Sequence, residues 1–203
     1  MRRFDTPPGP PGWAGQGAEL LRVVDPTGRA IAWLAPGFGG SGVGYAARRA
    51  EDTTGGWRQI LHTGSPRELR AEPLAYGCAI LGPGTDERHR AREAAWRFVE
   101  RDPTAATCAA RCGPAHPGDP FVVGLTLTAS LEDAALRLDL SATNEGDGTL
   151  TIAPGLRLNF AAGFRAADGA AAPRRRTFRH EDGALVLTVT PGGATAARFG
   201  AAA

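Results

Sequence analysis

Apolar and polar residues alternate along three segments of the chain between residues 120 and 160. The segments read PFVVGLTLTAS, AALRLDLSATN and TLTIAPGLRLNF, and short polar turns separate them. In the second segment, leucines at positions 136, 138 and 140 alternate with polar side chains. A period of two places one face of a β-strand in the core and the other in water. We therefore predict an antiparallel meander, with hairpin connections at Glu132-Asp133 and at 144–148.

The rest of the chain predicts more strands and little helix. Residues 19–24 and 29–34 form a predicted hairpin around the turn Asp25-Pro26-Thr27-Gly28. Further strands are expected at 95–99, 184–190 and 195–199. Residues 66–74 are expected to be irregular, residues 85–94 to form a loop, and residues 104–112 to form a strand or a short helix.

These elements predict an all-β fold, an antiparallel β-sandwich. Residues 1–17 are rich in Pro and Gly and are expected to form a flexible tail. Residues 18–203 are expected to form a single β-sandwich domain, because a chain of this length can bury most of its apolar surface in one core.

Several short motifs follow one another between residues 19 and 160. They are Arg29–Gly40, with a Pro and a Gly-Gly turn; Gly56–Leu61, a strand that begins with Trp; Tyr76–Leu81, a second short strand; Arg88–Arg92 followed by Trp96; the strand pair Leu131–Leu150; and Gly155–Phe160. Their order and spacing resemble the aldose 1-epimerase (galactose mutarotase) family. There, the fourth motif reads His-Gly-Phe-Ala-Arg and the last reads Gly-x-His-Pro-Tyr-Phe.

The resemblance implies a shortened galactose mutarotase-like supersandwich whose concave sheet carries the site. It also implies an aldose 1-epimerase-like sugar isomerase. In that reaction a base takes the proton of the anomeric hydroxyl and an acid protonates the ring oxygen, so the ring opens and closes again on the other face. An imidazole and a carboxylate with separated pKa values suit this chemistry at neutral pH.

The resemblance also implies the site residues. The implied acid–base groups are His89, beside the first family His position, and His180 or Glu181 near the C-terminus. The implied ligand contacts are Arg92, Arg157 and Asn159. His62 and His116, the other histidines of the chain, are further acid–base candidates. Each candidate has an alternative interpretation as a solvated loop residue or as the polar face of an ordinary strand.

The sequence departs from the family at the catalytic positions, which keeps other functions open. Both family histidines align with arginines, Arg88 and Arg157, and no Glu-Pro pair follows Glu145. Because Arg stays protonated in proteins, it cannot replace a titrating acid. One alternative is therefore a carbohydrate-binding or interaction domain without turnover. Another is the same scaffold serving as an isomerase or cyclase of a secondary metabolite.

The composition of the chain excludes several other classes of function. The 23 basic and 21 acidic residues give a net charge of +2, too small for a nucleic-acid surface. Every basic residue is Arg, so mechanisms that need a lysine, such as a Schiff base or a P-loop, are excluded. The N-terminus lacks the apolar region of a signal peptide, and no segment is apolar enough to span a membrane. We therefore expect a cytoplasmic protein that binds a small polar ligand, such as a sugar or another polar ring compound. The sequence leaves open whether the protein forms a homodimer.

Three local patterns favour ordinary structure over a ligand site. Gly37–Gly42 fits the dinucleotide-binding pattern G-x-G-x-x-G, but a broad turn between antiparallel strands suits it better. Cys108, Cys112 and His116 are spaced by four, but Gly and Pro interrupt the helix that would align them as metal ligands. The arginines at 174–176 are typical of a solvated loop. We expect neither a cofactor nor a metal.

Overall fold

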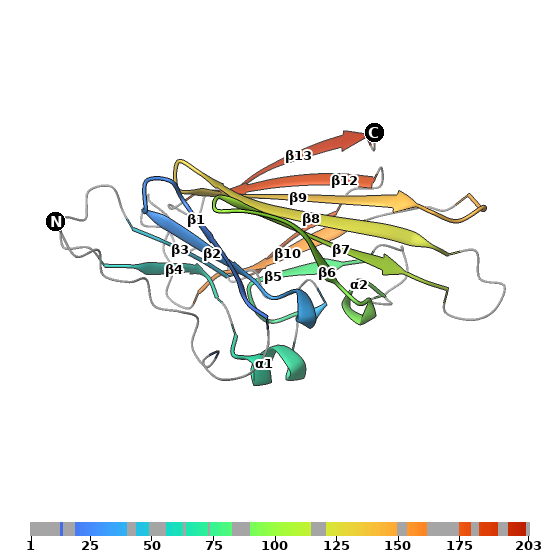
Figure 1. Ribbon diagram of the computed structural model, residues 1–203, viewed down its shortest axis with the longest axis horizontal. Coiled ribbons are helices and arrows are strands. Elements are labelled where there is room, and N and C mark those ends of the chain that lie inside the picture. Colours follow the sequence, from blue (N-terminus) through green and yellow to red (C-terminus); the bar gives the residue numbers. More distant parts are fainter. Residues whose placement is uncertain are drawn as a thin grey trace.

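In the residues that the structure describes, most of the regular secondary structure is antiparallel β-strand (Figure 1). The computed structural model describes residues 13, 19–39, 44–48, 56–62, 64–72, 74–82, 90–114, 121–149, 154–161, 175–179, 183–190 and 195–201. The strands are β1 (Leu21–Val24), β2 (Ala30–Leu34), β3 (Gly44–Ala47), β4 (Arg58–Leu61), β5 (Cys78–Leu81), β6 (Arg97–Asp102), β7 (Ala105–Cys112), β8 (Val123–Glu132), β9 (Ala135–Asn144), β10 (Gly155–Asn159), β11 (Arg175–Arg179), β12 (Gly183–Val189) and β13 (Thr195–Ala201). The helices are the 3-10 turn η1 (Pro36–Phe38), α1 (Pro66–Ala71) and α2 (Arg90–Glu93).

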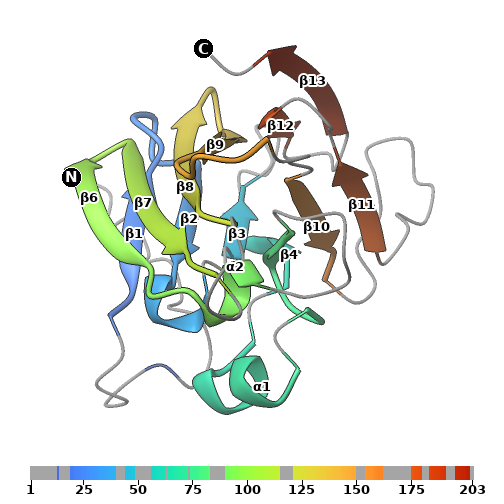
Figure 2. The same ribbon diagram turned by 90° about the vertical axis from the view of Figure 1, so that its right-hand side faces the viewer.

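The strands form two layers (Figures 1 and 2). One layer is a six-stranded sheet in the order β13-β12-β9-β8-β7-β6. The other contains a four-stranded sheet, β1-β2-β3-β4, and a three-stranded sheet, β11-β10-β5. A bridge between Leu61 and Phe160 joins the end of β4 to the end of β10. Helix α1 lies below β4 in both views, away from β12 and β13.

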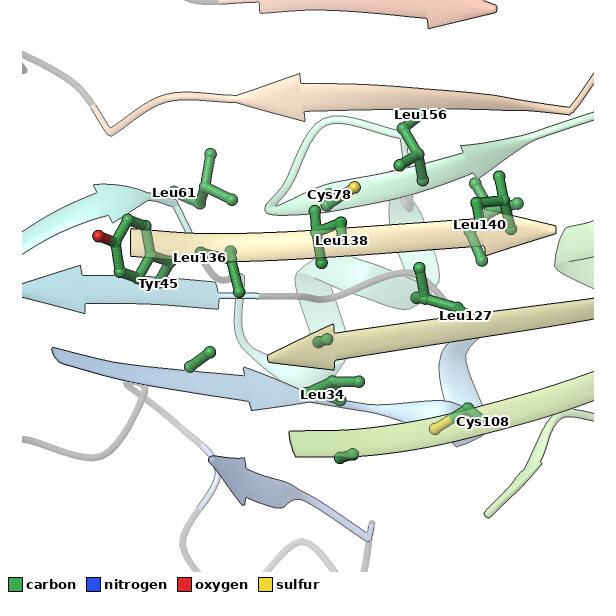
Figure 3. Close-up of a cluster of buried hydrophobic side chains, with 14 of the residues drawn as sticks. Leu34, Tyr45, Leu61, Cys78, Cys108, Leu127, Leu136, Leu138, Leu140 and Leu156 are labelled. Atoms are coloured by element: carbon green, nitrogen blue, oxygen red, sulfur yellow. The ribbon is translucent and has the colours of Figure 1, made fainter. Parts of the chain in front are cut away.

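The core lies between the two layers. The apolar positions of β8 and β9 alternate with polar ones and are at most 3% exposed, from Val123 through Leu131 and from Leu136 through Leu140. Figure 3 shows Leu127, Leu136, Leu138 and Leu140 beside inward side chains of the second layer. That second set is Leu34, Tyr45, Leu61, Cys78 and Leu156. Each buried leucine contributes about 2 kcal/mol, so the alternating pattern is what holds the sandwich together.

One buried carboxylate ties the layers together at the hairpin ends. Asp25 is 2% exposed and accepts hydrogen bonds from its own turn, at Thr27 and at the Arg29 amide. Its other oxygen accepts from the Ala134 amide, 3.0 Å away in the β8–β9 turn. The carbonyl of Ala134 accepts from the Tyr45 hydroxyl. Asp133 and Ala134 have φ of 47° and 61°, a conformation that L-residues avoid and that these bonds hold in place.

Much of the predicted secondary structure is confirmed. The hairpin around residues 25–28 is β1 and β2. The predicted strands at 184–190 and 195–199 are β12 and β13, and β13 is an edge strand as expected. Residues 105–112 form strand β7, not a helix, with Cys108 and Cys112 buried in the core. The fold class is confirmed: the protein is an all-β antiparallel sandwich.

The predicted meander is wrong in its third strand. Strands β8 and β9 pair as a hairpin, but the partners of β10 are β5 and β11 in the other layer. The free edge of β9 pairs with β12 instead. Residues 144–148 form a turn stabilised by the Asn144 side chain, which bonds to the Gly146 amide and the Gly148 carbonyl. This turn leads across the sandwich and does not close a hairpin.

Three further segments also differ from the prediction. The segment predicted as irregular contains α1, because Ser65 and Glu68 form a capping box. Within the predicted loop, Arg90–Glu93 form α2. The basic run continues as strand β11, paired with β10, although residue 174 itself lies outside the described residues.

One residue of the predicted tail is ordered against the domain. Trp13 is 8% exposed, and its indole NH donates to the Gly64 carbonyl at 3.0 Å. Its ring packs edge-on against Phe38, with centroids 5.3 Å apart. The other residues of 1–17 lie outside the described part of the chain.

Candidate functional site

The candidate site lies on the outward face of β10. Leu156, Leu158 and Phe160 point into the core, so the alternating residues Arg157 and Asn159 point the other way. The sequence prediction that these two side chains share a face is therefore confirmed. Arg157 is half-buried and stands between Ala79 of β5 and Thr177 of β11. Ala79 is fully buried and has a single methyl group, which leaves space for the guanidinium stem beside it.

Asn159 is fixed by the chain around it. It is 4% exposed, and its amide nitrogen donates to the carbonyls of Leu74 and Gly77, at 3.2 and 3.3 Å. Its backbone NH also donates to the Gly77 carbonyl, at 2.8 Å. These bonds hold the segment before β5 against the end of β10. Asn159 therefore positions the face on which Arg157 lies.

His62 joins this face from β4. Its backbone NH donates to the Asn159 carbonyl at 3.0 Å, directly beside the bridge between Leu61 and Phe160. Because Leu61 points into the core, His62 points outward, on the side of Asn159 and Arg157. Its ring centroid is 5.1 Å from that of Tyr76. From the sequence, His62 was one of four candidate acid–base histidines and was not assigned to the site. The sequence feature that could have indicated its place in the site is its position just after a strand that ends in the apolar residues Ile60 and Leu61.

Two acidic groups, one in α1 and one at its C-terminal end, interact electrostatically with the His62–Tyr76 pair. Hydrogen bonds from the Ser65 amide and hydroxyl lower the pKa of Glu68, and the nearby His62 adds to this shift. Burial, together with the charges of Glu68 and Glu72, raises the pKa of the Tyr76 phenol. The Tyr76 ring lies directly over Gly64, where a Cβ would come within 2.7 Å of the ring. A glycine is therefore required under this ring.

Arg92 lies at the other end of β5. Helix α2 begins where the Ala91 amide donates to the Gly82 carbonyl, at 3.1 Å, just after β5 ends. The Trp96 indole donates to the Ala91 carbonyl at 2.6 Å, so the predicted Arg-to-Trp spacing closes a compact turn. Arg92 is exposed. The helix that carries Arg92 adjoins the Leu81 end of β5. His62 and Tyr76 lie near the opposite end of β5, at Cys78. Arg157, which pairs with Ala79, lies between the two ends of this strand.

The remaining predicted site residues lie outside the described residues. These are His89, His180 and Glu181, the acid–base groups implied by the resemblance. The same holds for His116 of the Cys108–Cys112–His116 pattern. Within the described ranges, no group of three or more His, Cys, Asp or Glu residues is placed to hold a metal ion. In the same part of the chain, no helix is long and apolar enough to cross a membrane.

The Gly-rich motif lies between two antiparallel strands, as predicted, and its residues 40–42 lie outside the described residues. Strands β2 and β3 on either side of it pair antiparallel, so the βαβ unit of a dinucleotide site is absent from these described strands. Gly39 caps η1 with a φ of 68°, and its α-carbon packs on the backbone of Arg92. The glycine thus brings η1 against α2.

The described groups place a guanidinium, an amide and an imidazole on one face of the sheet. Arg157 presents a permanent positive charge with planar NH donors, which suits oxygen-rich ligands. His62 supplies an imidazole, the side chain whose ordinary pKa lies nearest neutral pH. The two lie on one face, with the fixed Asn159 between their strand positions.

Comparisons with known proteins agree with this architecture. No protein-family model matches the chain, and neither does any curated protein sequence. Solved structures do match. A GalM/aldose epimerase homologue from C. elegans is 16% identical, with a TM-score of 0.54, over 74% of this chain and 53% of that one. A galactose mutarotase-like protein from Lactobacillus casei is also 16% identical, with a TM-score of 0.53, over 84% of this chain and 72% of that one.

A third match covers most of both chains. A Synechocystis protein is 17% identical, with a TM-score of 0.55, over 89% of this chain and 84% of that one. By contrast, the chain spans only about half the length of the C. elegans protein. The fold is therefore that of a galactose mutarotase-like β-sandwich, and the resemblance first seen in short motifs extends to the three-dimensional structure.

Proposed function

We propose that this protein binds a sugar on the outward face of β10 and isomerises it at the anomeric carbon, as a mutarotase does. The observation that carries the proposal is the meeting of His62, Asn159 and Arg157 on one sheet face of a galactose mutarotase-like fold. An imidazole and a guanidinium on one rigid surface supply the proton transfer and the oxygen contacts that ring opening needs.

Each group has a separate role in this proposal. Arg157 and Arg92 donate hydrogen bonds to sugar oxygens, while Asn159 holds the face in shape. His89 protonates the ring oxygen, and Glu181 or His180 takes the proton of the anomeric hydroxyl, as the resemblance implies. His62 is a further acid–base group, and it lies on the outward face of β10 with Arg157 and Asn159. Ring closure then returns both protons, so the sugar leaves with only its anomeric configuration changed.

A mutarotation assay tests this function. We expect the protein to speed the interconversion of α-glucose or α-galactose above the buffer rate, measured by polarimetry and by NMR exchange. His62→Gln should lower the added rate about 100-fold, the usual contribution of a general acid or base. Arg157→Gln should weaken sugar binding. Arg97→Gln is the matched control, because Arg97 is an exposed arginine on β6. A rate no higher than that of buffer would contradict an isomerase.

A second function, sugar binding without turnover, has one observation in its favour. Arg157 occupies the position that corresponds to a family histidine, and it cannot titrate at neutral pH. If the assay shows no added rate, NMR titration with the same sugars decides whether the protein binds a sugar without turning it over. Binding that Arg157→Gln weakens and Arg97→Gln leaves unchanged would establish the binding domain. Absence of binding would exclude both functions for these sugars.

A further inference from the structure

A groove lies at the opposite edge of the second layer from the β10 face. Strands β2, β3 and β4 separate β1 from the β10 face. The groove has a volume of about 430 Å³ and is lined by Arg22, Val24, Arg101, Asp102 and Pro103. One wall is the edge strand β1, and the other is the end of β6 with the turn that follows it. The groove is thus formed where the edges of two different sheets meet.

The two walls are held together by the backbone. The Val24 amide donates to the Pro103 carbonyl at 2.9 Å. Leu21 and Val23 point into the core, so Arg22 and Val24 point outward from β1. This bond therefore fixes the strand that carries Arg22 against the turn that follows Arg101. The spacing of the two arginine backbones is set before any ligand arrives.

The charges of the groove favour an anion. Asp102 is its acidic residue, and one of its oxygens already accepts from the Thr104 amide and hydroxyl, at 2.8 and 2.6 Å. Within the described part of the chain, neither the Arg22 nor the Arg101 side chain has a hydrogen bond or an ion pair. Two guanidinium groups against one engaged carboxylate leave a net positive charge. Guanidinium forks match the geometry of carboxylate and phosphate oxygens.

We propose that this groove binds a small organic anion, with its carboxylate or phosphate between Arg22 and Arg101 and its apolar part on Val24 and Pro103. This site is independent of the sugar site proposed on β10. Its ligand class follows from the lining, which combines two cationic guanidinium groups with two apolar side chains.

NMR titration of the full chain tests the proposal with three probes: butyl phosphate, butyrate and uncharged butanol. We expect saturable shifts of the Val24 and Asp102 amides with one or both anions and none with butanol. The anion that saturates identifies the preferred group. Arg22→Gln and Arg101→Gln should each weaken the affinity about tenfold, because each removes a charged hydrogen bond.

Arg97→Gln is the matched control, since it removes an exposed arginine from β6 outside the groove. Its affinity for the anions should equal that of the parent protein. The proposal would be overturned if butanol produced the same shifts, if neither anion saturated them, or if Arg97→Gln weakened binding as much as the two groove variants. Thermal unfolding of all variants confirms that these exposed substitutions leave the fold intact.

Discussion

Asp25 shows how one buried side chain joins two turns that are distant in sequence. Burial alone would raise the pKa of its carboxyl group. The hydrogen bonds from Thr27, Ala134 and Arg29 outweigh burial and keep this pKa below its usual value. The carboxylate is thus the stable form, and it holds the β1–β2 and β8–β9 turns together.

Asp25→Asn should reduce the free energy of unfolding by about 2 kcal/mol, measured by urea unfolding at neutral pH. The amide nitrogen of the new Asn would face backbone NH groups whose hydrogen bonds the carboxylate had accepted, and two donors cannot bond to each other. Asp133→Asn is the control, because Asp133 is exposed in the neighbouring turn and Asn tolerates positive φ. It should change stability by less than about 0.5 kcal/mol.

The same carboxylate predicts a pH dependence. Because its pKa is lower in the folded state, its contribution is present above the unfolded-state pKa of about 3.9 and is lost as pH falls through the folded value. The stability gap between the parent protein and Asp25→Asn should therefore shrink below about pH 4. A gap that stayed constant down to pH 2 would contradict this role.

At the residue scale, the sequence predicted part of the candidate site. Alternation alone places Arg157 and Asn159 on one face, since side chains two apart on a strand point the same way. The hydrogen-bond partners of the Asn159 amide lie 82 and 85 residues away, so no local pattern could reveal its positioning role. His62 was underestimated for the same reason: its neighbours Asn159 and Tyr76 become adjacent only in the folded chain.

Among the elements, the contact between η1 and α2 depends on the absence of a side chain. A Cβ at Gly39 would lie 2.6 Å from the α-carbon of Arg92. Gly39 also has a φ of 68°, which a residue with a Cβ adopts only with strain. Both facts require glycine at the end of η1.

Gly39→Ala should therefore destabilise the protein by at least about 2 kcal/mol, and it should shift α2 with its exposed Arg92. Urea unfolding gives the first effect, and the backbone NMR shifts of Ala91 and Arg92 give the second. Gly37→Ala is the matched control in the same motif, because a Cβ there meets nothing within 4 Å. Equal stability of the two variants would show that the η1–α2 contact contributes little.

Elements with a strong local pattern were predicted well, and those set by distant partners were not. Strands β8 and β9 follow from alternation, and the β1–β2 hairpin follows from its turn residues. The position of β10 was predicted, but its neighbours were not, because β12, from the end of the chain, takes the free edge of β9. The short helix α1 was missed, although Ser65 and Glu68 were a readable capping signal.

For the whole molecule, the three cysteines report on the integrity of the core. Cys78, Cys108 and Cys112 are buried, and none of them forms a disulfide. Burial raises the pKa of the Cys78 thiol, and burial with the charge of Glu19 raises that of Cys108 to about 11. Because the thiolate is the reactive form, the thiols of Cys78 and Cys108 are protected both by being covered and by a raised pKa, whereas Cys112 is protected by its burial.

We expect these thiols to react with Ellman's reagent at pH 8 only as fast as the sandwich opens. In urea above the unfolding midpoint, all of them should react at the rate of an exposed cysteine, whose pKa is about 8.5. Asp25→Asn provides a check, because a less stable core should open more often and react faster. Rapid reaction of the folded parent protein would show that the layers separate without unfolding.

The position of β10 between β5 and β11 also affects the order in which the molecule can assemble. The hairpin β8–β9 joins neighbouring stretches of chain, whereas β10 must pair with a strand that lies far earlier in the sequence, as Leu158 pairs with Cys78. Closing so long a loop is slow, since its entropy is lost before the contact forms. During synthesis on the ribosome, strand β5 would therefore stay unpaired, with its apolar side uncovered, until residue 160 had emerged.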